Sequence, residues 1–169
     1  MSRDLDTRVV QMTVLIEKRV TKYNPARRDA AGRYLSEEWT SFGDIGNGVS
    51  LEEYQHFESM YIVTALEFIR ESGLSGMRIA GLENPTNHAI SFQEGTWLSI
   101  DALEEAFRLV LRDHFWCRFE SDSGAYVHFG RDYYMYVGVT RTSPLVIVSA
   151  ERRGLFVEDF QSPYRDADN

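Results

Sequence analysis

The sequence predicts an α+β fold in which a mostly antiparallel sheet packs against about three helices. Two observations predict it: three stretches begin at serine start signals, two of them with helical apolar spacing, and a run of three short strands fills residues 115–139. Helices and strands mix without a regular strand–helix–strand period, which argues against a parallel sheet. With 169 residues, the chain is expected to form a single domain over residues 1–169.

Helices are expected at residues 50–72, 99–113 and 143–153. Each begins at a serine whose side chain can accept a free backbone N–H of the first turn. Ser50 is followed three residues later by Glu53, the spacing of a capping box. Ser143 is followed directly by proline, which is favoured at the first helical position. These local signals define the helical part of the fold.

Shorter strands are expected at residues 77–82, 89–92 and 155–157. Residues 8–16 are rich in β-branched side chains and favour a strand, although the spacing of their apolar residues also fits a helix. Residues 24–49 contain an Asn-Pro pair and three clustered glycines, so we expect an irregular, loop-rich segment. The polar residues 162–169 are expected to fray.

The strands at residues 115–120, 125–129 and 133–139 are expected to form a meander, with turn residues between them. Side chains alternate between the two faces of a strand, so each face can be listed from the sequence. The apolar face, expected to be core, carries Phe115, Cys117, Phe119, Ala125, Val127, Phe129, Met135 and Val137. The opposite face carries Trp116, Arg118, Glu120, Tyr126, His128, Tyr134 and Tyr136.

This second face is our candidate partner-binding surface, together with Asp122 and Asp132 in the adjoining turns. Tyrosine, tryptophan and arginine are enriched at binding hot spots because they combine a large contact area with a polar group. The alternative is that the N-terminal segment or a helix covers the face and makes it a second core layer. The solvent accessibility of Trp116, Tyr126 and Tyr136 decides between the two: if all three are buried within the monomer, the face is not an interface.

Charge and composition exclude several classes of protein. The net charge of −8 disfavours nucleic-acid binding, which depends on neutralising phosphates, and favours a basic partner. The single cysteine excludes a disulfide-stapled secreted scaffold. We find no signal peptide and no run of about 18 apolar residues, so we expect a cytoplasmic protein without a membrane partner.

No catalytic, cofactor or metal motif is present, so the sequence predicts a protein that is not an enzyme and has no cofactor. The four histidines lie far apart and outside any zinc-binding spacing. Cys117 lies near His114 and His128 in the sequence, which resembles a thiol–imidazole pair. Because Cys117 is expected to face the core, it should behave as an inert apolar side chain.

The segments Phe115-Trp116-Cys117-Arg118 and Tyr133-Tyr134-Met135-Tyr136-Val137-Gly138, with the Ser-Pro helix after them, resemble bacterial immunity proteins of polymorphic-toxin and contact-dependent inhibition systems. The resemblance covers roughly the last two thirds of the chain and is one of class: small, acidic, single-domain proteins without a catalytic motif. It implies a protein that neutralises a cognate toxin domain by direct contact, and a basic toxin would suit the charge.

Two other functions remain open. A small-ligand-binding protein or enzyme would have a deep pocket with converging polar groups. A self-associating structural protein would have an apolar patch that meets its own copy. The sequence does not fix the oligomeric state.

Overall fold

A computed structural model describes residues 13–35 and 37–165, and within them the chain forms three α-helices and one seven-stranded sheet. The expected α+β class is therefore confirmed. In chain order the elements are β1 (Ile16–Thr21), the 3-10 helix η1 (Phe42–Asp44), α1 (Leu51–Glu71), β2 (Gly76–Glu83), β3 (Trp97–Ser99), α2 (Ile100–Leu111), β4 (Trp116–Glu120), β5 (Tyr126–Phe129), the 3-10 helix η2 (Arg131–Tyr133), β6 (Met135–Val139), α3 (Pro144–Arg152) and β7 (Phe156–Asp159).

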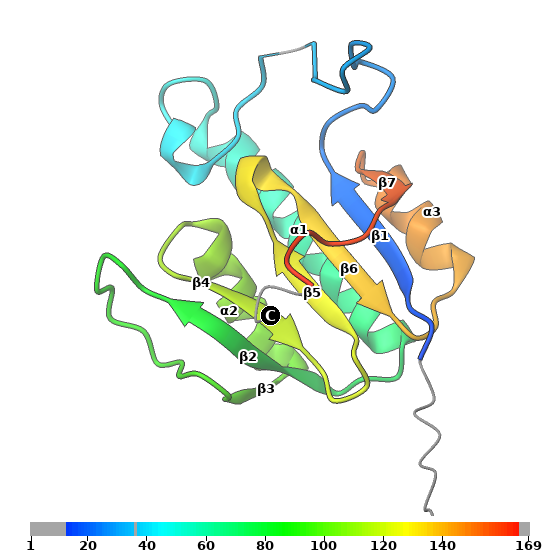
Figure 1. Cartoon of the computed structure of the whole chain (residues 1–169). Helices are drawn as coiled ribbons and strands as arrows, with labels where there is room; N and C mark the ends of the chain where they lie inside the picture. Colours follow the sequence, from blue (N-terminus) through cyan, green and yellow to red (C-terminus); the bar gives the residue numbers. More distant parts are fainter. Residues whose placement is uncertain (1–12, 36, 166–169) are drawn as a thin grey trace, which may run out of the picture.

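The sheet has the strand order β3-β2-β4-β5-β6-β1-β7, and every neighbouring pair is antiparallel (Figure 1). β4, β5 and β6 form the predicted meander at its centre. β1 lies between β6 and β7, so that Ile16 pairs with Val139 on one side and Lys18 with Asp159 on the other. The sheet is open, with β3 and β7 as its edge strands.

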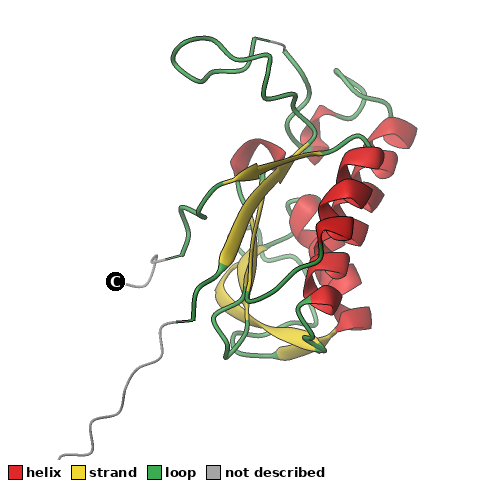
Figure 2. Cartoon of the chain, turned by 90° about the vertical axis from the view of Figure 1, so that its right-hand side faces the viewer, coloured by secondary structure: helices red, strands yellow, loops and turns green. Residues whose placement is uncertain are grey.

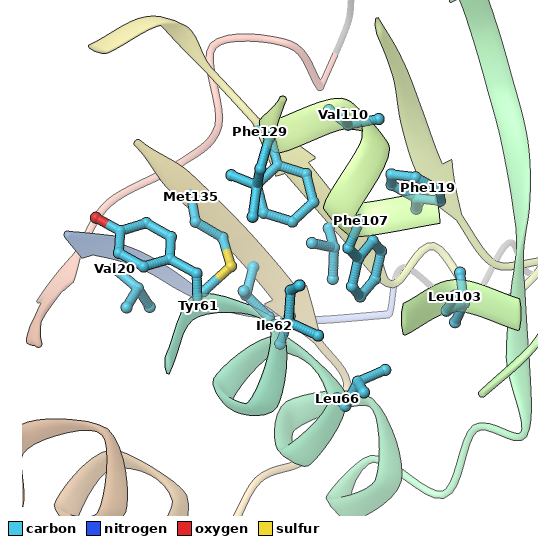
Figure 3. Packing of buried hydrophobic residues seen from close by; sticks show 14 of the residues in the cluster. Val20, Tyr61, Ile62, Leu66, Leu103, Phe107, Val110, Phe119, Phe129 and Met135 are labelled. Atoms are coloured by element: carbon cyan, nitrogen blue, oxygen red, sulfur yellow. The ribbon is translucent and has the colours of Figure 1, made fainter. Parts of the chain in front are cut away.

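All three helices lie on one face of the sheet, which leaves the other face without a helix (Figure 2). The apolar core fills the space between the helices and the sheet (Figure 3). Phe107 of α2 illustrates the packing, because its ring centroid lies 4.7 Å from that of Phe119 and 5.3 Å from that of Phe129. All eight residues predicted on the inner face of the meander are buried, so the predicted side-chain alternation is confirmed.

The serine caps also form as expected. Ser50 Oγ accepts the backbone N–H of the third helical residue of α1 at 3.1 Å, and Ser143 Oγ accepts that of Leu145 in α3 at 3.2 Å. At α2 the corresponding bond to Ser99 is longer, at 3.4 Å. Because these contacts join residues two or three positions apart, they depend on local sequence alone.

Three local expectations differ from the structure. Residues 8–12 lie outside the described residues, and the strand begins only at Ile16. Residues 89–92 form no strand, and the edge strand β3 lies instead at Trp97–Ser99. Fraying at Ser162 is not observed, since its side chain is hydrogen-bonded and the residue is 4% exposed. Residues 166–169 lie outside the described residues.

Between β1 and α1, the residues that the structure describes form no strand of the sheet and only the short helix η1. This part contains a loop that extends beyond the end of the sheet (Figure 1). Figure 2 places the loop towards the side of the sheet that lacks helices. Among the described residues, no helix combines the length and apolar character needed to cross a bilayer.

Candidate functional site

The predicted outer residues of the meander lie on the face of the sheet opposite the helices, which we call the helix-free face. Strand register aligns them in two transverse rows with residues of β1. One row contains Arg19, Tyr136, His128 and Arg118, and the other contains Glu17, Gly138, Tyr126 and Glu120. The sheet therefore brings together side chains that lie more than 100 positions apart in the sequence, such as Glu17 and Tyr126, whose hydroxyl donates to the Glu17 carboxylate at 2.8 Å.

A short segment that follows β7, residues 160–165, crosses the middle of this face, and we call it the strap (Figure 1). Its centre is Ser162, whose Oγ is hydrogen-bonded to His128 Nδ1 at 2.8 Å. The backbone N–H of Ser162 donates to the Tyr126 hydroxyl at 3.3 Å. Further along the strap, the Tyr164 ring lies 5.3 Å from the Trp116 ring. The strap is thus held by hydrogen-bonding side chains of the meander, His128 and Tyr126, and not by an apolar surface alone.

The strap changes the exposure of the predicted binding residues. Tyr126 is 2% exposed and Tyr136 is 5% exposed, whereas Trp116 remains half-buried. Arg118 and His128 are also buried. Among the described residues, the centre of the face is therefore covered within the monomer by the strap and not by a helix. Residues 1–12 of the N-terminal segment, the other covering element that we considered, lie outside the described residues.

The other predicted residues remain at least partly accessible. The side chain of Asp122 is 92% exposed, and Asp132 is exposed as well. Glu120 and Tyr134 are half-buried. The structure thus separates the predicted set into a covered centre and accessible margins.

Glu120 connects the covered centre to solvent. Its carboxylate accepts a hydrogen bond from Arg118 Nε at 2.8 Å, and the same oxygen lies 3.4 Å from His128 Nε2, outside good hydrogen-bond geometry. The nearby imidazole of His128 and the Arg118 guanidinium hold the pKa of Glu120 below its usual range despite partial burial. Burial lowers the pKa of His128, and the neighbouring carboxylate only partly offsets this. We therefore expect a neutral His128 beside an ionised Glu120 at neutral pH.

Ser162, His128 and Glu120 are residue types that also form hydrolase relays. Here Ser162 is almost fully buried, and its Oγ accepts the backbone N–H of Tyr164 at 3.2 Å in addition to its contact with His128. Neither of the two grooves beside the strap is lined by Ser162. This geometry is more consistent with Ser162 as an anchor for the strap than with Ser162 as a nucleophile that contacts a substrate.

One groove lies on each side of the strap. The first, of about 450 Å³, is bordered by Glu120 and Asp122, with Tyr126 and His128 at its wall. The second, of about 510 Å³, contains the half-buried ring of Trp116. Both are open to solvent, so they suit protruding side chains of a partner at least as well as an enclosed small molecule.

An aromatic patch, formed by Tyr34, Tyr134 and Phe160, lies at the β1–β7 side of the same face. Arg19 links two of its rings, because its guanidinium carbon lies 4.1 Å from the Phe160 ring centroid and 5.4 Å from that of Tyr134. The Tyr34 and Tyr134 rings are 6.3 Å apart. Burial and the neighbouring Tyr34 raise the pKa of Tyr134 to about 12, against the opposing effect of Arg19, so its hydroxyl remains a hydrogen-bond donor at neutral pH.

The arginines of this patch are held by Glu158. Its carboxylate accepts hydrogen bonds from both Arg19 and Arg28, at distances of 3.0–3.3 Å. Arg28 also stacks on the Tyr34 ring, with 4.5 Å between its guanidinium carbon and the ring centroid. The rings and cations are therefore fixed in place before any partner binds, which lowers the entropic cost of binding.

Sequence reasoning identified Tyr134 but missed Tyr34 and Phe160. Tyr34 lies in a loop and Phe160 follows an edge strand, so neither belongs to the alternating pattern that revealed the meander. The neighbouring basic pair, Arg27-Arg28, was the only local signal, and nothing in the sequence indicated that it folds against β7.

Comparison with protein-family models, with curated proteins and with solved structures gives no match to this chain. Its function must therefore be inferred from the helix-free face itself.

Proposed function

We propose that this chain is an immunity-type protein that neutralises a cognate bacterial toxin domain by direct contact through the accessible margins of the helix-free face. The observation that carries the proposal is the aromatic patch: three rings that are partly exposed and held in place by arginines, on a sheet face without helices. Phe160 is 42% exposed, and Tyr34 and Tyr134 are half-buried.

The chemistry of this patch supports recognition of a protein. Aromatic rings and arginines supply a large contact area at little entropic cost when their positions are fixed beforehand. The carboxylates of Glu120 and Asp122, at the groove on the other side of the strap, add acceptors for basic side chains of the partner. A net charge of −8 should in addition accelerate the encounter with a basic toxin.

Co-expression tests the proposal. The chain should restore growth to cells that produce the toxin domain encoded beside it, and the purified proteins should bind one to one. Tyr134→Ala and Tyr34→Ala should each weaken binding by about 2 kcal/mol, roughly 30-fold in Kd, because each removes a ring from the patch. Calorimetry would measure this difference.

The matched control is Leu145→Ala on α3, which removes a 73%-exposed apolar side chain from the helical layer. It should leave both binding and growth unchanged. Thermal unfolding of each variant separates lost contact from lost folding. If Leu145→Ala abolishes protection while both tyrosine variants retain it, the partner binds the helical layer and the proposed surface is wrong.

A further inference from the structure

Residues 27–35 form a hairpin-like loop fixed by its own hydrogen bonds, which we call the arginine hairpin. Two backbone bonds join its arms: Leu35 N–H donates to the Arg27 carbonyl at 2.9 Å, and Asp29 N–H donates to the Arg33 carbonyl at 2.8 Å. The Asp29 side chain stabilises the turn by accepting the backbone N–H of Arg33 at 2.9 Å. A loop with this many internal bonds presents its side chains in defined positions.

The hairpin is attached to the helix-free face at its base. Arg28 donates to both oxygens of the Glu158 carboxylate, at 3.0 Å each, and so ties the loop to β7. Tyr34, from the opposite arm, contacts Tyr134 of the aromatic patch. The hairpin therefore continues the surface to which we assign partner binding.

Both arms of the hairpin carry exposed side chains for which no partner lies among the described residues. Arg27 and Arg33 are exposed, and neither guanidinium has an acceptor among residues 13–35 and 37–165. Beside them, Leu35 is 70% exposed. Two unpaired cations and an exposed apolar side chain on a rigid loop form a local exception on a chain with a net charge of −8. Such a combination suits contact with a surface of opposite charge.

We propose that the arginine hairpin docks against a carboxylate-lined surface of the toxin domain, an inference that rests on the proposed function. Two arginines can each form bidentate hydrogen bonds with a carboxylate, and Leu35 adds an apolar contact beside them. The partner thus has an acidic region facing the hairpin and basic residues facing Glu120 and Asp122. Opposite charges at the two margins of one face fix the orientation of the complex.

A polyanion such as nucleic acid fits the hairpin less well. Two unpaired arginines would neutralise about two phosphates, which contributes little to affinity at physiological salt. The exposed carboxylates of Glu37 and Glu38 also lie close to the hairpin in the sequence and would repel a phosphate backbone. A protein partner can confine its carboxylates to the area that faces Arg27 and Arg33, whereas a phosphate backbone carries charge along its whole length.

Charge reversal tests the inference within the complex. The double variant Arg27→Glu/Arg33→Glu should weaken binding to the toxin domain by about 100-fold. The control, Arg70→Glu/Arg152→Glu, makes the same change of net charge, from −8 to −12, on exposed arginines of α1 and α3, and should change binding by less than about threefold. Suppressors selected in the toxin domain should replace Asp or Glu with Lys or Arg. Equal effects of the two double variants would overturn the inference.

A second measurement does not depend on the toxin. At low salt, titration with hexaglutamate should shift the backbone amide NMR signals of residues 27–35, and Arg27→Glu/Arg33→Glu should abolish these shifts. Shifts located elsewhere, or tighter binding of a six-nucleotide single-stranded DNA, would contradict an acidic protein partner. If the wild-type chain protects no cell but hexaglutamate binds the hairpin, the proposed function fails while the hairpin's preference for carboxylates stands.

Discussion

Gly138 shows how a single residue shapes the helix-free face. It pairs with Tyr126 across β5 and β6, and a Cβ atom at this position would lie 2.3 Å from the Tyr126 ring. The ring therefore occupies the space left by the missing side chain, which lets its hydroxyl reach Glu17 on β1. Without this glycine, the contacts from the meander to β1 and to the strap could not form as they do.

We expect Gly138→Ala to reduce the free energy of unfolding by about 2 kcal/mol, because the new methyl group displaces a buried ring. Urea denaturation would measure the change. The control is Gly43→Ala, whose Cβ would meet Ser41 Oγ at an ordinary 3.5 Å, so its effect should stay within about 0.5 kcal/mol. Equal losses for the two variants would show that the position of the Tyr126 ring is not what requires glycine.

For single residues, the sequence predicted which face of a strand a side chain points to better than it predicted how exposed that side chain is. Alternation along a strand placed Tyr126 and His128 on the face opposite Cys117, because the side-chain period of a strand is a local property. Their burial depends on Ser162, more than 30 positions further along the chain. A polar segment of this kind resembles a mobile tail in sequence, so the covered centre could not be predicted.

Among the elements, the strap determines how much of the candidate surface is available. Ser162 holds it through the hydrogen bond to His128, and Phe160 N–H donates to the Glu17 carbonyl at 3.3 Å. The rings of Tyr164 and Tyr136 also meet, 6.1 Å apart. Because these contacts are few, the strap should open at lower free energy than the strands beneath it.

Ser162→Ala should destabilise the protein by about 1–2 kcal/mol, because it leaves the buried His128 Nδ1 without its partner. Hydrogen exchange should accelerate in the strap more than in α1, and denaturation would give the stability change. Ser91→Ala, a substitution at an exposed loop serine, provides the control and should alter neither measurement. Unchanged exchange in the strap of Ser162→Ala would show that ring contacts alone hold it.

The elements themselves were predictable to different degrees. The three helices follow from capping serines, and the first two also from apolar spacing; these signals act over a few residues. The edge strand β3 was misplaced, because its position depends on β2: a Cβ at Gly76 would lie 2.1 Å from the Leu98 carbonyl oxygen and 2.5 Å from the Trp97 ring. Pairing across such a glycine, rather than β-propensity at residues 89–92, decides where this strand forms.

For the molecule as a whole, the buried imidazole of His128 makes the free energy of unfolding depend on pH. Burial lowers the pKa of His128 below its usual value of 6.5, despite the nearby Glu120. The His128 imidazole therefore binds a proton more readily in the unfolded chain than in the folded one as the pH falls through its usual pKa of 6.5, so this group should lower the free energy of unfolding as the solution becomes more acidic.

His128→Gln should flatten this pH dependence, because the amide does not titrate. Gln55→Ala, at an exposed position of α1 that carries no titratable group, should leave the dependence as it is in the wild type. Urea midpoints measured at several pH values would compare the three proteins. A wild-type slope that persists in His128→Gln would assign the titration to another group.

The order of strands was beyond sequence reasoning, since it depends on pairings between distant segments. The position of β1 between β6 and β7 is the clearest case. It also has a consequence for synthesis. Both edges of β1 stay unpaired on the nascent chain until the residues around Val139 and Asp159 leave the ribosome, and an open edge readily pairs with foreign strands. Under the proposed function, protection by a newly made chain would begin only late in each round of translation.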